Sequence, residues 1–245
     1  MTRDVVVFDV WGDYAYFRRG YTTTSTISYP FPSRTTIAGF VAGLLGFPRD
    51  SYYTLFNEEN SRIGLKIVNP IKKTRLNLNY VNTKENMLLS EIKTTGKRTQ
   101  VPAEFLKDVK YRLYISLEDN EIMDQLYELL REHKSIFTPY LGITECLCNF
   151  KLIGNGIYSV NETCGENVSI DSVLVKRDVN ICIEKDKKYG VVKSPGFMND
   201  DRSVKSFIEY FYESNAKPIL VDSCTYYKIG EDNVILYWWD ILSSG

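Results

Sequence analysis

Two adjacent arginines, Arg18 and Arg19, follow a mainly apolar segment at residues 5–10 and two tyrosines at positions 14 and 16. A guanidinium group can bind a phosphate through two parallel hydrogen bonds, so a pair of arginines is well suited to a phosphate backbone. The solvated end of a strand would have the same composition. The pair is therefore a candidate contact with a phosphate backbone, beside a plain structural interpretation.

A second candidate site is the start of an expected helix. Ser33, Arg34, Thr35 and Thr36 offer hydroxyl groups and one positive charge at the position where a helix leaves backbone N–H groups unpaired. Such helix starts bind anions readily. Simple capping of the helix by Ser33 explains the same residues, and the two interpretations are compatible.

The densest positive charge lies between residues 69 and 112, with ten Lys and Arg against four Asp and Glu, a net charge of +6. The whole chain carries a net charge of −1, so any attraction to nucleic acid has to be local. Lysine and arginine bind phosphates without regard to sequence, and a neighbouring aromatic ring can stack on a base. A solvated surface loop is the alternative. The predicted contacts here are Lys72, Lys73, Arg75, Tyr80, Lys93, Lys97 and Arg98.

The turn at residues 139–142 adds two further candidates, Tyr140 and Gly142. A glycine allows a backbone to come close to a ligand such as RNA. An ordinary turn would use the same residues, so this signal is weak.

Residues for catalysis or metal binding are sparse. His133 is the chain's only histidine, and its spacing from Leu126 and Leu129 predicts a structural place near the buried side of a helix end. Cys146 and Cys148 form one C-x-C pair without a second pair at zinc-site spacing. Neither a Walker loop nor a dinucleotide fingerprint occurs. We therefore expect no catalytic residue, no metal ion and no cofactor.

The elements that would position these residues follow from periodicity. Strands are predicted at residues 5–10, 62–68, 111–117 and 146–153, and helices at 33–45 and 120–134. The order strand, helix, strand, strand, helix, strand is that of a ferredoxin-like α+β domain. The connection of about forty residues between the second and third strands is too long for a plain loop. It predicts an extended basic hairpin over about residues 70–110, with Leu76, Leu78 and Tyr80 alternating along one arm.

Two regions are expected in a chain of this length. Residues 1–153 would form the ferredoxin-like domain with its insert, and residues 154–245 a smaller β-rich part. In the second region, strands are predicted at residues 173–175, 179–183, 190–192, 219–221 and 234–239, with one helix at 204–212.

The compartment follows from the cysteines and from the start of the chain. Five cysteines, an odd number, and a start without a secretory leader favour reduced thiols in the cytoplasm. No apolar run approaches the roughly 18 residues of a membrane span, so no membrane partner is expected.

Residues 8–47, the basic insert and the turn at 139–142 together resemble the fifth family of CRISPR-associated proteins (Cas-five), within the RAMP superfamily. The resemblance covers about residues 4–155, and its most specific part is the run from Pro32 to Gly39. The variant resembled belongs to type I-B Cascade complexes. The resemblance implies an RRM-like core that caps the 5′ handle of the CRISPR RNA, with the insert acting as a thumb against RNA.

The same resemblance implies several protein partners. These are a backbone subunit of the seventh Cas family and a large subunit of the eighth, with target DNA reached only through the guide. We therefore interpret the chain as a non-catalytic RNA-binding subunit. Two alternatives remain open: a metal-independent endoribonuclease that processes precursor CRISPR RNA, as in some type I-C relatives, and a metabolite-binding ferredoxin-like regulatory domain.

Overall fold

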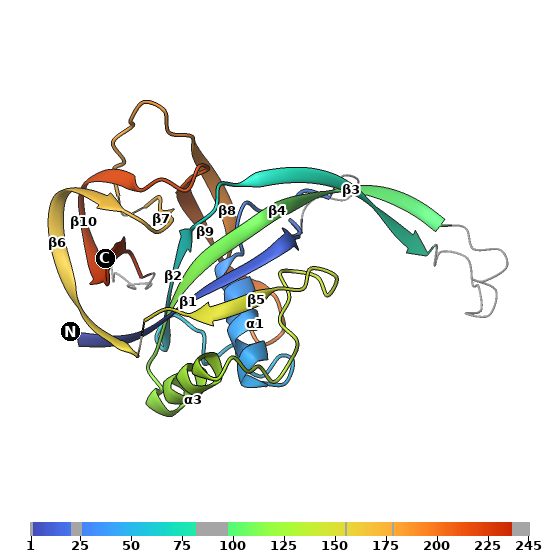
Figure 1. The fold of residues 1–245 in the computed structure, drawn as a ribbon, viewed down its shortest axis with the longest axis horizontal. Helices are drawn as coiled ribbons and strands as arrows, with labels where there is room; N and C mark the ends of the chain where they lie inside the picture. The colour runs from blue at the N-terminus through green and yellow to red at the C-terminus, as the bar shows by residue number, and fades with distance from the viewer. Residues whose placement is uncertain (1, 21–25, 82–97, 155, 178, 237–245) are drawn as a thin grey trace.

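The computed structural model describes residues 2–20, 26–81, 98–154, 156–177 and 179–236 (Figure 1). The helices in these ranges are α1 (Arg34–Leu45) and α3 (Asn120–Arg131), and neither is long and apolar enough to cross a membrane. The strands are β1 (Thr2–Ala15), β2 (Ser61–Ile67), β3 (Lys72–Val81), β4 (Arg98–Leu117), β5 (Asn149–Leu152), β6 (Tyr158–Ile170), β7 (Leu174–Val175), β8 (Tyr189–Met198), β9 (Val204–Glu213), β10 (Ile219–Ile229) and β11 (Asp232–Val234).

Four strands form the predicted ferredoxin-like sheet, in the order β5-β1-β4-β2 with each neighbouring pair antiparallel. Phe8 of β1 and Leu65 of β2 both lie opposite Leu113 of β4. The side chains on this face join those of α1 and α3 in one buried apolar cluster, which includes Val41 and Leu126. The α+β prediction is therefore confirmed.

Helix α1 begins and ends as the sequence predicts. Ser33 is the N-cap, and its hydroxyl oxygen accepts a hydrogen bond from the backbone N–H of Thr36. Gly46 ends the helix in the left-handed conformation, with φ of 82°. A β-carbon at this glycine would lie 2.7 Å from the side chain of Ile136, so the packing also excludes a larger residue.

Helix α3 ends earlier than predicted, and the place of His133 differs. The backbone N–H of Lys134 bonds back to the carbonyl of Leu129, while His133 adopts a positive φ of 54°. This is the arrangement that closes a helix with a left-handed residue. His133 is exposed and stacks on Phe150, with ring centroids 4.8 Å apart, so the prediction of a place near the buried side was wrong.

The predicted basic hairpin is present and projects from the rest of the molecule (Figure 1). Strand β3 pairs with the first half of β4, from Lys72 opposite Lys107 to Val81 opposite Arg98. The second half of β4 continues into the centre of the sheet, between β1 and β2. Asp108, with φ of 53°, marks the junction between the two halves. Lys93 and Lys97 lie outside the described residues.

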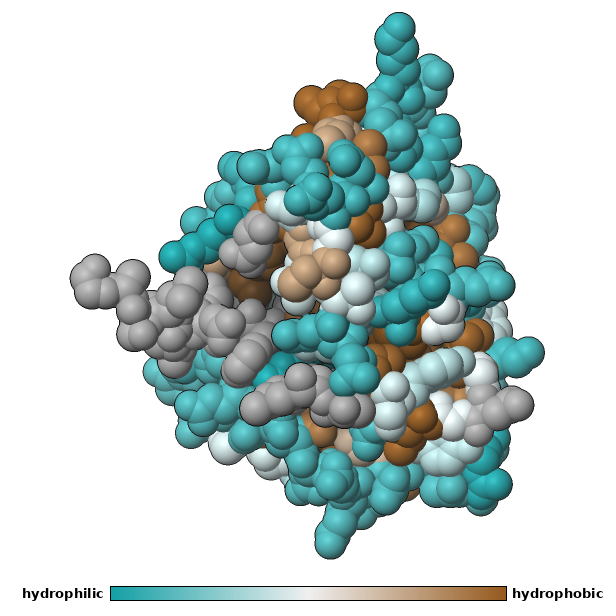
Figure 2. Space-filling view, turned by 90° about the vertical axis from the view of Figure 1, so that its left-hand side faces the viewer, coloured by the Kyte–Doolittle hydropathy of each residue, from teal (hydrophilic) through white to brown (hydrophobic). Residues whose placement is uncertain are grey.

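The C-terminal region is β-rich, and it continues the same sheet. Strand β6 pairs with the first residues of β1, and β10 and β11 follow in order. The strands curl over the face of the sheet opposite the helices, where Val7, Tyr114 and Val234 share a second buried cluster. The boundary predicted at residue 153 therefore falls between two strands that both bond to β1. The outer side of β6 and β10 is mainly hydrophilic (Figure 2).

The predicted helix at residues 204–212 is wrong, because these residues form β9. They pair with β8 in a separate sheet of order β7-β9-β8. Ile208 and Tyr210 are buried while Phe207 and Glu209 are exposed, which is the period of a strand. The strand predicted at residues 179–183 is also absent, and Ile181 makes only an isolated bridge to Val221.

A polar network ties the C-terminal strands to the central sheet. Arg112 of β4 donates from Nε to Asp9 of β1 at 2.7 Å and from Nη1 to Asp232 of β11 at 2.9 Å. Asp232 also accepts hydrogen bonds from Lys66 and from the hydroxyl of Tyr114, each at 2.6 Å. These partners compensate the charges that the curled sheet places in its interior.

Candidate nucleic-acid interface

The base of the hairpin is held by the segment that follows β1. The ring of Tyr16 stacks on Phe105 of β4, with centroids 4.9 Å apart. The backbone N–H of Glu104 donates to the carbonyl of Thr26 at 2.8 Å. These contacts place Arg18 and Arg19 beside the hairpin base, so the structure brings two of the predicted sites together.

The two arginines differ in their surroundings. Arg18 is exposed, and its backbone forms an isolated bridge with Ser28. Arg19 is half-buried, and its guanidinium lies 5.2 Å from the centre of the Tyr29 ring. Arg18 therefore presents its charge to solvent more fully than Arg19.

The helix start serves the protein itself more than the sequence indicates. Ser33 is buried, and its hydroxyl caps the helix and also hydrogen-bonds the hydroxyls of Thr35 at 3.0 Å and Thr36 at 2.8 Å. The capping interpretation of Ser33 is confirmed, and its prediction as a contact with RNA is corrected. Thr35 and Thr36 are half-exposed.

Arg34 also needs correction, because only 3% of this residue is exposed. Its Nη1 donates to the carbonyl of Phe56 at 2.7 Å, and its Nη2 donates to the hydroxyl of Ser61 at 2.6 Å. The guanidinium lies 4.0 Å from the centre of the Phe197 ring. Burial lowers the pKa of Arg34 to about 10, so it stays charged at neutral pH. The side chain fixes α1 to its neighbours and does not face a phosphate outside.

The cations of the hairpin remain on the surface. Lys72 forms an ion pair with Asp108 at 3.3 Å, and Lys73 forms one with Glu104 at 3.1 Å. Arg75 is exposed on the same strand. Exposed ion pairs are worth little and exchange readily, so these side chains are available to phosphates.

The hairpin also exposes apolar surface. Leu76 is 38% exposed and Tyr80 is 46% exposed, and both lie on the same face of β3 as Leu78. A tyrosine in this position can stack on a base or contact a protein. Lys107, exposed opposite Lys72, adds a cation that the predicted set omitted, although its charge was part of the basic segment.

The turn at residues 139–142 docks on the end of β1. The backbone N–H of Tyr16 donates to the carbonyl of Leu141 at 3.0 Å. Gly142 has φ of 93°, and a β-carbon there would lie 2.0 Å from the carbonyl oxygen of Tyr16. The glycine therefore permits close approach of the protein's own backbone, and because it is exposed, its role in the approach of RNA stays a prediction. Tyr140 is exposed and lines a small apolar cavity together with Thr36.

Residues 5–207 match the family model described as CRISPR-associated protein (Cas_Cas5). The chain belongs to the Cas-five family. No curated protein matches it in sequence.

Two solved structures show the same fold as this Cas-five protein. One is a CRISPR protein from Archaeoglobus fulgidus, 17% identical, with a TM-score of 0.51 over 95% of this chain and 99% of that chain. The other is a chain of the Type III-B Cmr-beta complex bound to cognate target RNA and AMPPnP. It is 10% identical, with a TM-score of 0.51 over 88% of this chain and 86% of that chain. At such identities the likeness concerns the RAMP-like α+β fold alone.

The predicted site residues of the Cas-five chain that remain on the surface therefore fall into two groups. Arg18, Thr36 and Tyr140 surround the end of β1, while Lys72, Lys73, Arg75 and Tyr80 extend along the hairpin. Arg98 begins β4 at the outer part of the hairpin. Across the described ranges, no three His, Cys, Asp or Glu side chains cluster closely enough to hold a metal ion.

Proposed function

We propose that this Cas-five protein is a non-catalytic RNA-binding subunit of a type I-B Cascade complex, where it holds the 5′ handle of the CRISPR RNA. The observation that carries the proposal is the projecting basic hairpin with Arg18 at its base. Contacts of this kind bind a phosphate backbone independently of sequence.

The partners proposed from the resemblance are backbone subunits of the seventh Cas family and a large subunit of the eighth. The exposed Leu76 and Tyr80 on the hairpin support contact with a macromolecule beyond phosphates, because tyrosine is enriched in interfaces. Target DNA would be read by the guide and not by this chain.

The test uses the full chain and single-stranded RNA. The triple change Lys72→Glu, Lys73→Glu and Arg75→Glu should weaken binding and lower the slope of log affinity against log salt by about 2, the share of three phosphate contacts. The matched control reverses the exposed Lys185, Lys188 and Lys228, which lie outside the hairpin.

The 5′-handle proposal is tested by purification of the complex and sequencing of the bound RNA. A constant segment at the 5′ end of many guides is expected with the wild-type chain and should be depleted by the hairpin variant. Equal retention of guides by the hairpin variant and the control variant would contradict the proposal.

A further inference from the structure

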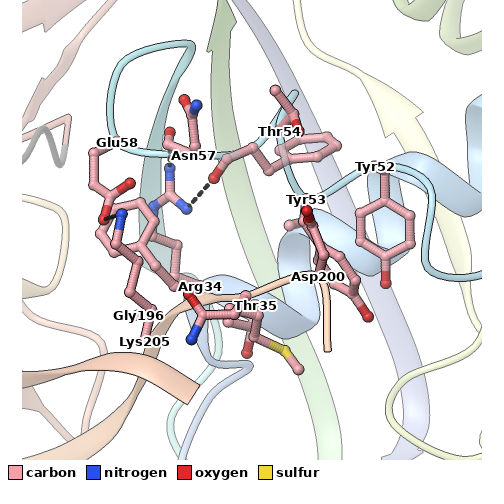
Figure 3. A pocket seen from close by; sticks show the side chains of 15 residues that line it. Arg34, Thr35, Tyr52, Tyr53, Thr54, Asn57, Glu58, Gly196, Asp200 and Lys205 are labelled. Carbon is pink, nitrogen blue, oxygen red and sulfur yellow. Dashed lines mark hydrogen bonds and ion pairs between the residues drawn. The ribbon is translucent and has the colours of Figure 1, made fainter. Parts of the chain in front are cut away.

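A cavity of about 170 Å³ lies between the start of α1, the loop of residues 48–60 and the turn between β8 and β9 (Figure 3). Aromatic rings form much of its wall. Tyr52 and Tyr53 have ring centroids 5.0 Å apart, and Figure 3 shows them on the side opposite Glu58 and Lys205. The cavity is smaller than the ~300 Å³ at the lower end of pockets for drug-sized ligands, so a single planar ring system is a suitable occupant.

Two ion pairs join the segments that form the cavity. Lys205 of β9 forms an ion pair with Glu58 at 2.8 Å, and Arg202 pairs with Asp50 at 3.4 Å. One pair joins the start of β9, and the other the turn between β8 and β9, to the loop of residues 48–60. Exposed pairs of this kind exchange readily, so the polar side chains can adjust to a ligand.

Arg34 lines the cavity with a guanidinium that the protein's own oxygens hold in place. In the described part of the chain, its guanidinium bonds to neutral oxygens of Phe56, Asn57 and Ser61. Its Nε is buried and does not open onto the cavity. Arg34 therefore contributes a wall that the protein holds in place and not a free donor.

The charges around the cavity argue against an anion. Arg34 and Lys205 line it together with Glu58 and Asp200, so two positive charges face two negative charges. A neutral ring that carries a hydrogen-bond acceptor suits this balance and the aromatic wall. Nucleobases have this chemistry, and proteins recognise unstacked RNA bases through aromatic rings and polar side chains.

We propose that this cavity binds one neutral nucleobase turned out of an RNA strand, with the base against the tyrosines and its polar edge toward Asn57 and Lys205 on the opposite side. The proposal deepens the proposed function and rests on it for the source of the base. Thr35 lines the cavity from the first turn of α1, so the strand that reaches Thr36 and Arg18 can also reach this site.

The test compares the full-length wild type with Thr35→Trp, which fills the cavity from an already half-exposed helix position. Thr163→Trp, at an exposed site on β6, is the matched control. A second variant, Tyr53→Ala, removes part of the wall without filling the space. The first probes are the four ribonucleosides, whose binding is measured by saturation-transfer NMR. The second probe is a set of single-stranded RNAs, each with one abasic position at a different place along its length. Thermal unfolding confirms that each variant is folded.

The expected result is loss of the nucleoside signal in both cavity variants. RNA affinity should fall on the order of tenfold in Thr35→Trp, as for the loss of one stacked base. One abasic position should cause the same loss in the wild type and no further loss in Thr35→Trp.

Two other outcomes separate this inference from the proposed function. If the hairpin variant loses RNA while Thr35→Trp changes neither nucleoside nor RNA binding, the cavity proposal is overturned and the function stands. If the wild type binds nucleosides, Thr35→Trp abolishes that binding, and the wild type retains no RNA, the proposed function fails. The base site is then supported, with free nucleosides as its source.

Discussion

Arg112 in the inner half of β4 donates a hydrogen bond of 2.9 Å to Asp232 in β11, although 120 positions separate the two residues. The same carboxylate accepts from Lys66 and Tyr114. The last described strand is therefore attached to the centre of the sheet by charge as well as by packing.

Replacement of Asp232 by Ala should destabilise the protein by about 2 kcal/mol, because the buried hydroxyl of Tyr114 loses its acceptor. The half-buried Lys66 and Arg112 each lose one of their two carboxylate partners. Urea unfolding measures the change in free energy. Glu231→Ala, at the exposed neighbouring position, is the control and should change stability by less than about 0.5 kcal/mol. Equal effects of the two changes would show that the network does not stabilise the fold.

The same carboxylate predicts a dependence of stability on pH. Burial alone would raise the pKa of Asp232, but hydrogen bonds from Lys66, Tyr114 and Arg112 outweigh it and hold the pKa below its usual value. A lowered folded-state pKa stabilises the protein above the unfolded pKa of about 4, and this stabilisation is lost as pH falls through the folded value. Thermal unfolding at pH 3 and pH 7 should therefore differ less in Asp232→Asn than in the wild type.

Two glycines should respond to alanine with opposite signs. Gly142→Ala combines a positive φ with a clash against Tyr16, so it should cost about 2 kcal/mol or more. Gly43→Ala has open space around the new β-carbon in the interior of α1 and should stabilise the protein by about 0.5–1 kcal/mol. Denaturant unfolding of both variants tests the pair, and a neutral Gly142→Ala would refute the docking of the turn.

Arg34 and Arg18 should separate stability from RNA binding. Arg34→Met removes the groups that donate hydrogen bonds to Phe56 and Ser61, so it should destabilise the protein by about 2 kcal/mol. The salt dependence of RNA binding should be unchanged. Arg18→Glu should leave stability unchanged and lower the slope of log affinity against log salt by about 0.7. Unfolding curves and RNA titrations at several salt concentrations measure both. A reversed pattern would contradict the corrected place of Arg34.

The non-catalytic part of the proposal has its own test. Repeat RNA incubated with the full chain should stay intact with EDTA and with Mg²⁺, because general acid–base cleavage needs a positioned base. Gel analysis of end-labelled RNA measures the outcome. Reproducible cutting at one site that disappears in His133→Ala would replace the proposal with the endoribonuclease alternative.

The ferredoxin-like core was predictable because its segments have clear periods. Apolar residues alternate or recur at helical spacing in β1, β2, β4, α1 and α3, and the basic hairpin followed from an insert too long for a loop. Strand β6 gave no such signal, because only Val160 and Ile170 of its residues are buried. The backbone hydrogen bonds of β6 are made with β1 and β10, and these strands come together only in the folded protein.

The errors have equally local causes. In β9, Phe207, Ile208, Phe211 and Tyr212 match helical spacing, although the β-branched and aromatic composition favours a strand. The burial of Arg34 depends on Ser61, which lies 27 positions away and approaches only when β2 is in place. The sequence marks an arginine at a helix start but does not show which acceptors will surround it.

Strand β4 runs unbroken for 20 residues from the outer hairpin to the middle of the sheet. A pull on the outer half is therefore transmitted along a single backbone into the ladders with β1 and β2. A change in the tilt of the hairpin would therefore have to be absorbed at Asp108 or would strain the hydrogen bonds of β4 with β1 and β2. A partner bound to the hairpin would consequently take an orientation that depends on the central sheet.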